Sequence, residues 1–245
     1  MPAAPASTLN GRLTGLAPLV AKSLVNQVVD AIVEAAAKGI FLPGDRIVEA
    51  ELARSLNVSR IPVREALRLL ESQGVVVSER YRGMSLMSVD IDRLEKILKV
   101  RLALEKLAGA EVMARLKTDP DTLAPLEKVL ARMHEAGKAD DGFRVASLDT
   151  EFHQMLCRLS GNEVLLSTFE PLSRQLTIIF GLSTMKKGVQ SIVEEHDVVL
   201  EVLRSGDQAA FDALMQMHIL DYSRAVDYEH LVEQLRKLES RRNAS

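Results

Sequence analysis

The stretch that decides the fold of this chain is SRIPVREALRLL, residues 59–70. Ser59 stands where a helix cap is expected, with a hydroxyl able to accept a hydrogen bond from a first-turn amide. Pro62 falls in that first turn, where its missing N–H leaves no bond unmade. Apolar residues recur at three- and four-residue steps and form a buried stripe. Another face carries three arginines at four-residue spacing: Arg60, Arg64 and Arg68. The stretch is predicted to be a capped helix whose arginine face can meet DNA.

The residues before this helix extend the pattern. Residues 49–56 are predicted to form a short helix, and residues 57–58 a tight turn into Ser59. A helix, a turn and a second, capped helix make the helix-turn-helix unit, whose second helix enters the major groove of DNA. A further helix is predicted at 17–38, with Gly39 as its stop, and packs under this unit.

The residues after the helix predict a wing. Gly74 is a suitable C-terminal cap for the helix. Two short strands are predicted at 75–77 and 84–87, joined by a basic hairpin tip that contains Arg82 and Gly83. The whole unit is therefore predicted to be a winged helix-turn-helix.

Several motifs of this unit resemble one family. They are PGD at 43–45, ELA at 51–53, VSR at 58–60, PVREAL at 62–67, LE at 70–71, Gly74 and RG at 82–83. Together they are similar to the DNA-binding domain of GntR-family bacterial transcription regulators. Two positions depart from the family pattern: Ile61 replaces the usual threonine, and Ala50 stands where some members carry a DNA-contacting arginine. The resemblance implies sequence-specific DNA binding without naming the operator.

Composition limits the fold class and the cellular compartment that can be expected for this chain. The 245 residues include few aromatic side chains and no tryptophan, which favours a mainly α protein of two domains. The single cysteine, Cys157, is expected to be a buried apolar residue and fits a reducing cytoplasm. No apolar run approaches the roughly 18 residues that a membrane span needs. The net charge is −3, yet residues 38–88 carry eight Lys/Arg against six Asp/Glu, so placed arginines must supply the specificity for DNA.

The chain divides into four predicted segments. Residues 1–16 are expected to be a disordered arm without the features of a signal peptide, 17–88 the winged helix-turn-helix, 89–238 a helical domain for effector binding and dimerisation, and 239–245 a flexible tail. Only helical periods follow the wing. Six helices are predicted, from about 90 to 117, 120 to 135, 143 to 159, 162 to 185, 189 to 203 and 207 to 238. The expected fold is a C-terminal antiparallel bundle of six or more helices.

A possible metal site lies in the helical domain. Asp149 and His153 are four residues apart and face the same way, while His196 and His218 belong to two other helices. All four are flanked by apolar residues and so point toward the bundle interior. Three imidazoles and a carboxylate suit a divalent transition metal. The alternative is that these histidines are ordinary core residues with satisfied hydrogen bonds.

A second resemblance bears on this choice. The motifs are DTEFH at 149–153, SGN at 160–162, EH at 195–196, LRSGD at 203–207 and MH at 217–218. They are similar to the helical effector-binding (FCD) domain of the FadR-like branch of GntR regulators. In the metal-binding members of that branch, the positions matching Asp149, His153, His196 and His218 are the ligands. The resemblance favours a metal, with zinc preferred and nickel or manganese as alternatives.

Two further residues are candidates for effector binding. Arg101 and Glu105 lie four residues apart on an apolar stripe, so either they pair with each other or Arg101 awaits an anion. In the similar family, the arginine matching Arg101 helps to hold an effector carboxylate beside the metal. Asn162 is expected to line the same cavity, although capping the next helix is its simpler role.

The function expected from these features is a cytoplasmic, homodimeric transcriptional repressor controlled by a small organic acid. The twofold symmetry of a dimer would fit a palindromic operator. The predicted DNA contacts are Ser59, Arg60, Arg64, Arg82 and Gly83. Two alternatives stay open: a metal-dependent enzyme, for which no general base is evident because Glu151 points away from the ligands, and an architectural DNA-binding protein without an effector.

Overall fold

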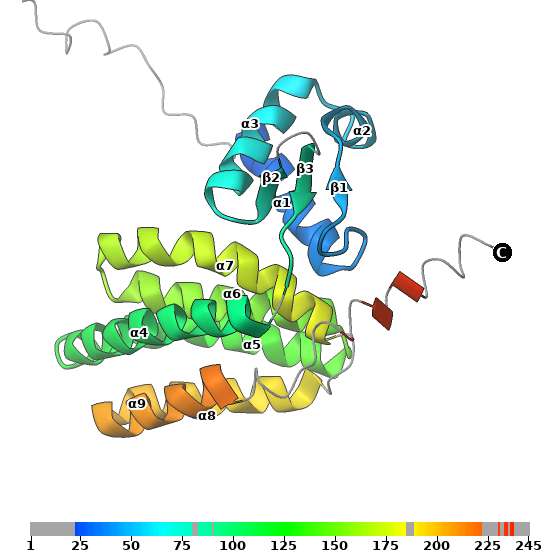
Figure 1. Cartoon of the computed structure of the whole chain (residues 1–245). Coiled ribbons are helices and arrows are strands. Elements are labelled where there is room, and N and C mark those ends of the chain that lie inside the picture. The colour runs from blue at the N-terminus through cyan, green and yellow to red at the C-terminus, as the bar shows by residue number, and fades with distance from the viewer. Residues whose placement is uncertain are drawn as a thin grey trace, which may run out of the picture.

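The computed structural model describes residues 23–79, 83–89, 91–184 and 189–221, together with five positions between 230 and 237. The predicted arm at 1–16, the predicted tail at 239–245 and the wing tip with Arg82 lie outside the described residues. Two units are stacked on each other: an N-terminal unit with a small sheet and a larger bundle of helices (Figure 1). This mainly helical, two-part architecture confirms the predicted fold class.

The N-terminal unit is a winged helix-turn-helix. Its elements are α1 (Leu24–Ala37), β1 (Arg46–Ile47), α2 (Glu49–Ser55), α3 (Arg60–Ser72), β2 (Val76–Glu79) and β3 (Gly83–Leu86). The strands form an antiparallel sheet in the order β1-β3-β2, with Val76 opposite Leu86. Strand β1 was not predicted, because two residues are too short for a periodic pattern and its position is fixed only by pairing with β3.

Helix α3 shows why residues 59–70 decide this fold. Val63, Ala66 and Leu70 are fully buried against the rest of the unit. Ser59 is at the N-cap position as predicted, but its side chain makes no capping hydrogen bond in the described structure. At the other end Gly74 has φ +69°, a left-handed conformation that glycine adopts without strain. The Gly74 amide donates to Glu71 O and the Val75 amide to Leu70 O, which closes the helix.

The C-terminal unit is an antiparallel helical bundle, also as predicted. Its helices are α4 (Ile91–Leu116), α5 (Ala124–Lys138), α6 (Gly142–Leu159), α7 (Glu163–Thr184), α8 (Val189–Ser205) and α9 (Gln208–Gln216), with a 3-10 turn at Pro120–Leu123 and a π-helical turn at Met217–Asp221. Aspartate caps begin two of them: the Asp141 and Asp207 carboxylates accept hydrogen bonds from the amides of Arg144 and Ala210. Across the described helices, none is both long and apolar enough to cross a membrane.

Three predicted helix limits were wrong. The helix expected from residue 120 begins as a 3-10 turn and becomes α-helical only at Ala124. Helix α5 continues to Lys138, so Gly137 lies in a helix rather than in a loop. The regular helix expected over 207–238 ends at Gln216 and passes into the π-helical turn. This last change matters, because the π-helical turn carries His218.

Candidate metal centre

Four side chains from three elements converge inside the bundle. Asp149 and His153 come from α6, His196 from α8, and His218 from the π-helical turn after α9. All four are buried, and one possible ligand atom from each lies within 4.8 Å of the others. The sequence prediction that these residues face a common interior point agrees with this placement.

The inward atoms are close enough to share one small ion. The Nε2 atom of His153 lies 3.2 Å from Nε2 of His196 and 3.2 Å from Nε2 of His218. Oδ1 of Asp149 is 3.1 Å from Nε2 of His196 and 3.9 Å from Nε2 of His153. Each ring therefore directs the same nitrogen, Nε2, toward a common centre.

The Nδ1 atoms of His196 and His153, which face away from the centre, explain why the Nε2 atoms of these two rings face inward. Nδ1 of His196 lies 2.7 Å from Ile192 O, which can only accept a hydrogen bond, so this Nδ1 carries a proton. Nδ1 of His153 lies 2.5 Å from Oε2 of Glu105. With their protons held on Nδ1 in this way, neutral rings direct their Nε2 lone pairs inward, which is the arrangement that a metal ion requires.

The pKa shifts describe the same centre without a metal. Burial alone would raise the pKa of Asp149, but the hydrogen bond with His196 and the nearby positive charges hold it well below its usual range. Burial lowers the pKa of His196, yet its bond to Asp149 outweighs burial and raises it. Burial and the Arg101 guanidinium hold the pKa of His153 well below its usual value. The opposite pKa shifts of Asp149 and His196 thus show that their mutual contact favours positive charge at this place, which suits a cation.

Unsatisfied polar atoms provide a second sign that the centre is built for a ligand. Oδ2 of Asp149 and Nδ1 of His218 are buried and have no hydrogen-bond partner among the described residues. The nearest carboxylate to His218 Nδ1 is Oε2 of Glu195, at 3.4 Å, too poorly placed for a hydrogen bond. Because an unpaired buried carboxylate oxygen is costly, Oδ2 of Asp149 supports a cation at the centre, whereas Nδ1 of His218 faces away from it. One carboxylate and three imidazoles fit a divalent transition metal.

Arg101 and Glu105 extend the centre along α4. Nε of Arg101 donates to Oε1 of Glu105 at 2.6 Å, while the other carboxylate oxygen faces His153. One NH2 group of Arg101 is buried without a partner in the described part of the chain. The sequence left open whether Arg101 pairs with Glu105 or awaits an anion; the structure pairs it with Glu105 and leaves it one buried donor to spare.

Asn162 lies between α6 and α7, and its hydrogen-bond partners lie outside the metal centre. Its Oδ1 accepts from the Leu165 amide at 3.1 Å and so caps α7, and its Nδ2 donates to Glu111 at 3.1 Å. These contacts support its capping role.

Cys157 is fully buried, as expected, and burial raises the pKa of its thiol.

Sequence reasoning missed two partnerships of functional residues. Glu105 was considered only with Arg101, since no local spacing reveals its contact with His153, 48 positions away. Likewise, Arg64 makes a two-pronged ion pair with Glu49 of α2, Nε to Oε2 at 3.0 Å and NH2 to Oε1 at 2.8 Å. Glu49 lies 15 positions before Arg64, beyond any helical spacing, so the pair could be found only from the packing of α2 on α3.

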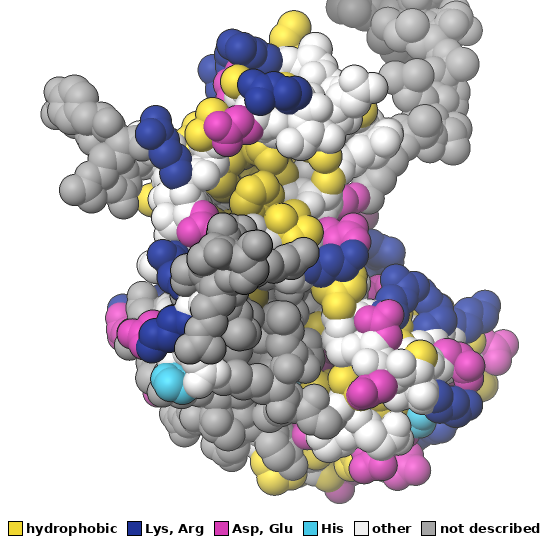
Figure 2. Space-filling model, turned by 90° about the vertical axis from the view of Figure 1, so that its right-hand side faces the viewer, with side chains coloured by type: hydrophobic (Ala, Val, Ile, Leu, Met, Phe, Trp, Pro, Cys, Tyr) yellow, Lys and Arg dark blue, Asp and Glu magenta, His cyan; other side chains and the backbone are white. Residues whose placement is uncertain are grey.

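The predicted DNA-binding face is exposed. Arg60, Arg64 and Arg68 are all solvent-exposed on α3, and Gly83, with φ +86°, begins β3. Lysine and arginine side chains gather at the end of the N-terminal unit farthest from the bundle (Figure 2). This location leaves them accessible to DNA.

Comparison with known proteins identifies the two units. The family described as bacterial regulatory proteins, gntR family, matches residues 24–86, and the FCD domain matches residues 96–221. The chain is a GntR-family transcriptional regulator. Its pairing of a GntR helix-turn-helix with an FCD domain places it in the FadR-like subfamily.

Individual relatives agree with this assignment. This GntR regulator is 31% identical over 195 residues to the uncharacterized HTH-type transcriptional regulator YdhC of Bacillus subtilis (strain 168), covering 79% of this chain and 84% of the relative. It is 23% identical over 237 residues to the gluconate operon transcriptional repressor of the same organism, covering 94% and 92%. The solved structure of E. coli McbR/YncC has the same fold, with a TM-score of 0.71 at 22% identity over 87% of this chain and 99% of that one. The two Bacillus relatives are named as transcriptional regulators, so the enzymatic alternative is set aside.

Proposed function

We propose that this GntR regulator is a cytoplasmic, homodimeric repressor whose operator binding is controlled by a small carboxylate effector at a metal ion. The observation that carries the proposal is the convergence of Asp149, His153, His196 and His218 beside the unpaired donor of Arg101. The proposed domain limits, 17–88 and 89–238, enclose the two family matches.

The four residues would hold the metal through one carboxylate oxygen and three imidazole nitrogens. Zinc suits this donor set best, and nickel or manganese would also accept it. The bound metal would supply a Lewis-acidic centre for an anionic ligand. The protein's own part is to orient the rings of His153 and His196 through their outward Nδ1 atoms, which face Glu105 and Ile192 O, and to keep the site buried.

Arg101 supports a carboxylate as the effector. Its guanidinium already donates to Glu105, and its remaining buried NH2 group needs an acceptor. A guanidinium and a metal together suit an anion with two oxygens. A relative is named as a repressor of a gluconate operon, and gluconate is a hydroxycarboxylate of this chemical class. Asn162 is a weaker candidate for the effector pocket, since both ends of its side chain are engaged.

The DNA-binding half of the proposal depends on α3 and the wing. Arg60 and Arg64 are proposed to contact bases or nearby phosphates, Ser59 a phosphate, and Arg82 with Gly83 the minor groove. In a dimer, two α3 helices would enter successive major grooves of a palindromic operator. Each two-pronged arginine contact with guanine would contribute about 1–3 kcal/mol of discrimination.

The metal is tested by elemental analysis of the purified, untagged chain. We expect about one equivalent of zinc, nickel or manganese per chain, lost in His196→Ala. His134→Ala is the matched control, because His134 is partly exposed and bonds Asp197 at 2.9 Å, outside the cluster. A chain that stays metal-free after incubation with all three ions would overturn the metal site.

The DNA contact is tested on duplexes selected by the wild-type chain from a random pool. Arg64→Ala should abolish gel-shift binding while the melting temperature changes little, because Arg64 is exposed. Arg68→Ala, one turn along the same face, serves as the control and should weaken binding far less. Unchanged affinity of Arg64→Ala would exclude the assigned role. The role of the metal in regulation is tested separately with His153→Ala. If this variant lost metal yet neither metal nor any ligand affected operator affinity, the chain would be an architectural DNA-binding protein without an effector.

A further inference from the structure

The bundle holds the end of α3 by two side chains. Gln175 of α7 donates through Nε2 to Gln73 O at 2.8 Å, and Arg93 of α4 donates through NH2 to Gly74 O at 2.8 Å. The same NH2 group lies 2.9 Å from Oε1 of Gln175, so the two side chains also bind each other. We call these two residues and the carbonyls of Gln73 and Gly74 the α3 clamp.

The chemistry of the clamp fits the end of a helix. The last carbonyls of a helix lack partners within it and carry the negative end of the helix dipole. The left-handed turn at Gly74 uses the carbonyls of Leu70 and Glu71, which leaves those of Gln73 and Gly74 for the bundle. A guanidinium and an amide N–H are the donors that such carbonyls favour. Gln175 is itself buried, so its two hydrogen bonds are partly shielded from water.

Helix α7 also contacts Arg101, whose partner Glu105 faces His153 of the metal centre. Phe180, five positions after Gln175, lies against Arg101, with the guanidinium carbon 5.3 Å from the ring centre. The next residue, Gly181, approaches α1 so closely that a side chain there would come within 2.7 Å of Ala37. One stretch of α7, residues 175–181, therefore touches α3, α1 and the arginine of the proposed effector site.

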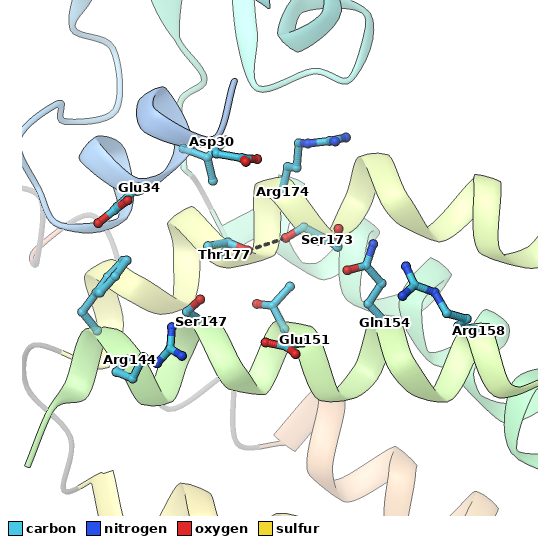
Figure 3. A pocket seen from close by; sticks show the side chains of 13 residues that line it. Asp30, Glu34, Arg144, Ser147, Glu151, Gln154, Arg158, Ser173, Arg174 and Thr177 are labelled. Carbon is cyan, nitrogen blue, oxygen red and sulfur yellow. Dashed lines mark hydrogen bonds between the residues drawn. The ribbon is translucent and has the colours of Figure 1, made fainter. Parts of the chain in front are cut away.

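A polar cleft lies beside this contact between the two units. A cleft of about 540 Å³ is lined by residues of α1, α6 and α7 (Figure 3). Its polar lining includes Asp30 and Glu34 of α1, Glu151 and Gln154 of α6, and Arg174 and Thr177 of α7. The two units thus meet at Arg93, Gln175 and Gly181, and the cleft lies beside these contacts.

We propose that Arg93 and Gln175 are positioning residues that couple the metal centre to α3. The inference rests on the proposed function and adds its route of regulation. Occupation of the centre pulls on His153, Glu105 and Arg101, and Phe180 transmits the change to α7. Gln175 then moves the end of α3, which sets the angle at which the arginine face meets DNA. A ligand shifts this equilibrium only through its preference for one position of α7.

The test is hydrogen–deuterium exchange of the full chain, metal-free and with Zn²⁺ added. The Gly74 and Val75 amides, both bonded within the α3 terminus, report on the clamp. In the wild type we expect Zn²⁺ to change their exchange by about threefold or more. In Gln175→Met, which keeps side-chain volume but removes both hydrogen bonds, and in Arg93→Gln, this response should fall to nearly none while Zn²⁺ affinity is retained.

Arg174→Ala is the matched control. Arg174 precedes Gln175 on α7 and lines the cleft (Figure 3), and it is not part of the α3 clamp, so its removal should leave the Zn²⁺ response intact. A purely structural role for the clamp would raise exchange in Gln175→Met equally with and without Zn²⁺, and would overturn the coupling. Bound Zn²⁺ without any response at Gly74 and Val75 in the wild type would overturn it too. Failure to bind Zn²⁺ would instead be a failure of the proposed metal site, seen separately in the elemental analysis.

Discussion

At the scale of single residues, Glu105 decides which nitrogen of His153 faces the metal centre. Its carboxylate accepts the Nδ1 proton at 2.5 Å and keeps the Nε2 lone pair inward. In Glu105→Gln, the amide N–H would donate to Nδ1 and move the ring proton to Nε2, where it blocks the metal. We expect Zn²⁺ affinity to fall by about 10- to 100-fold, measured by competition with a chelator.

The control for this residue is Glu111→Gln on the same helix. Glu111 accepts a hydrogen bond from Asn162 rather than from a ligand histidine. The substitution should leave Zn²⁺ affinity unchanged. An equal loss in both variants would assign the effect to the charge of α4 and not to the tautomer of His153.

At the scale of elements, the packing of α4 on α9 positions His218. A Cβ atom at Gly109 of α4 would lie 2.1 Å from the ring of Phe211 on α9. Because that ring is fully buried, Gly109→Ala must displace α9 and the π-helical turn that follows it. We expect a stability loss of about 1–3 kcal/mol together with weaker Zn²⁺ binding, measured by thermal unfolding and metal titration.

Gly206→Ala is the control that separates a loss of stability from a loss of Zn²⁺ binding. Gly206 has φ +70° and nothing within 4 Å of an added Cβ, so only backbone strain of roughly 1 kcal/mol is expected. This variant should melt earlier but bind Zn²⁺ normally. Normal Zn²⁺ binding by Gly109→Ala as well would show that α9 does not set the position of His218.

At the scale of the whole molecule, metal binding and protonation oppose each other. In the folded, metal-free chain, burial lowers the pKa of His153 and of His218, so the unfolded chain takes up protons first as pH falls. Stability from these two residues is present above their ordinary pKa and is lost on acidification. The raised pKa of His196 acts in the opposite direction and offsets part of this loss.

Zn²⁺ should therefore stabilise the chain most above pH 7. At a free concentration of about 100 times Kd, the stabilisation is about 2.7 kcal/mol. It should shrink toward pH 5, because the imidazoles must be deprotonated to bind metal. Thermal unfolding with and without Zn²⁺ across this range measures the effect, with His134→Ala as the control. A shift in melting temperature that is independent of pH would contradict binding through these histidines.

The sequence indicated most of the fold because the relevant signals are local. The apolar stripe of residues 59–70, the turn before it and the glycine after it each act over a few residues, so the winged helix-turn-helix could be recognised directly. The helical periods likewise predicted the bundle and the inward faces of Asp149 and His153. Strand β1 and the break after Gln216 were missed, since each depends on what packs against it rather than on its own residues.

What the sequence by itself determined is therefore the order of elements, the arginine face and the four residues with ligand chemistry. The tertiary structure alone decided how far apart those residues lie and which groups orient them: Glu105 at His153, Glu49 at Arg64, and the clamp that Arg93 and Gln175 make on α3. The physical reason is that hydrogen bonds and ion pairs act over about 3 Å in space. Their partners here are 15 to 102 positions apart in the chain, a separation that periodicity and capping patterns cannot span.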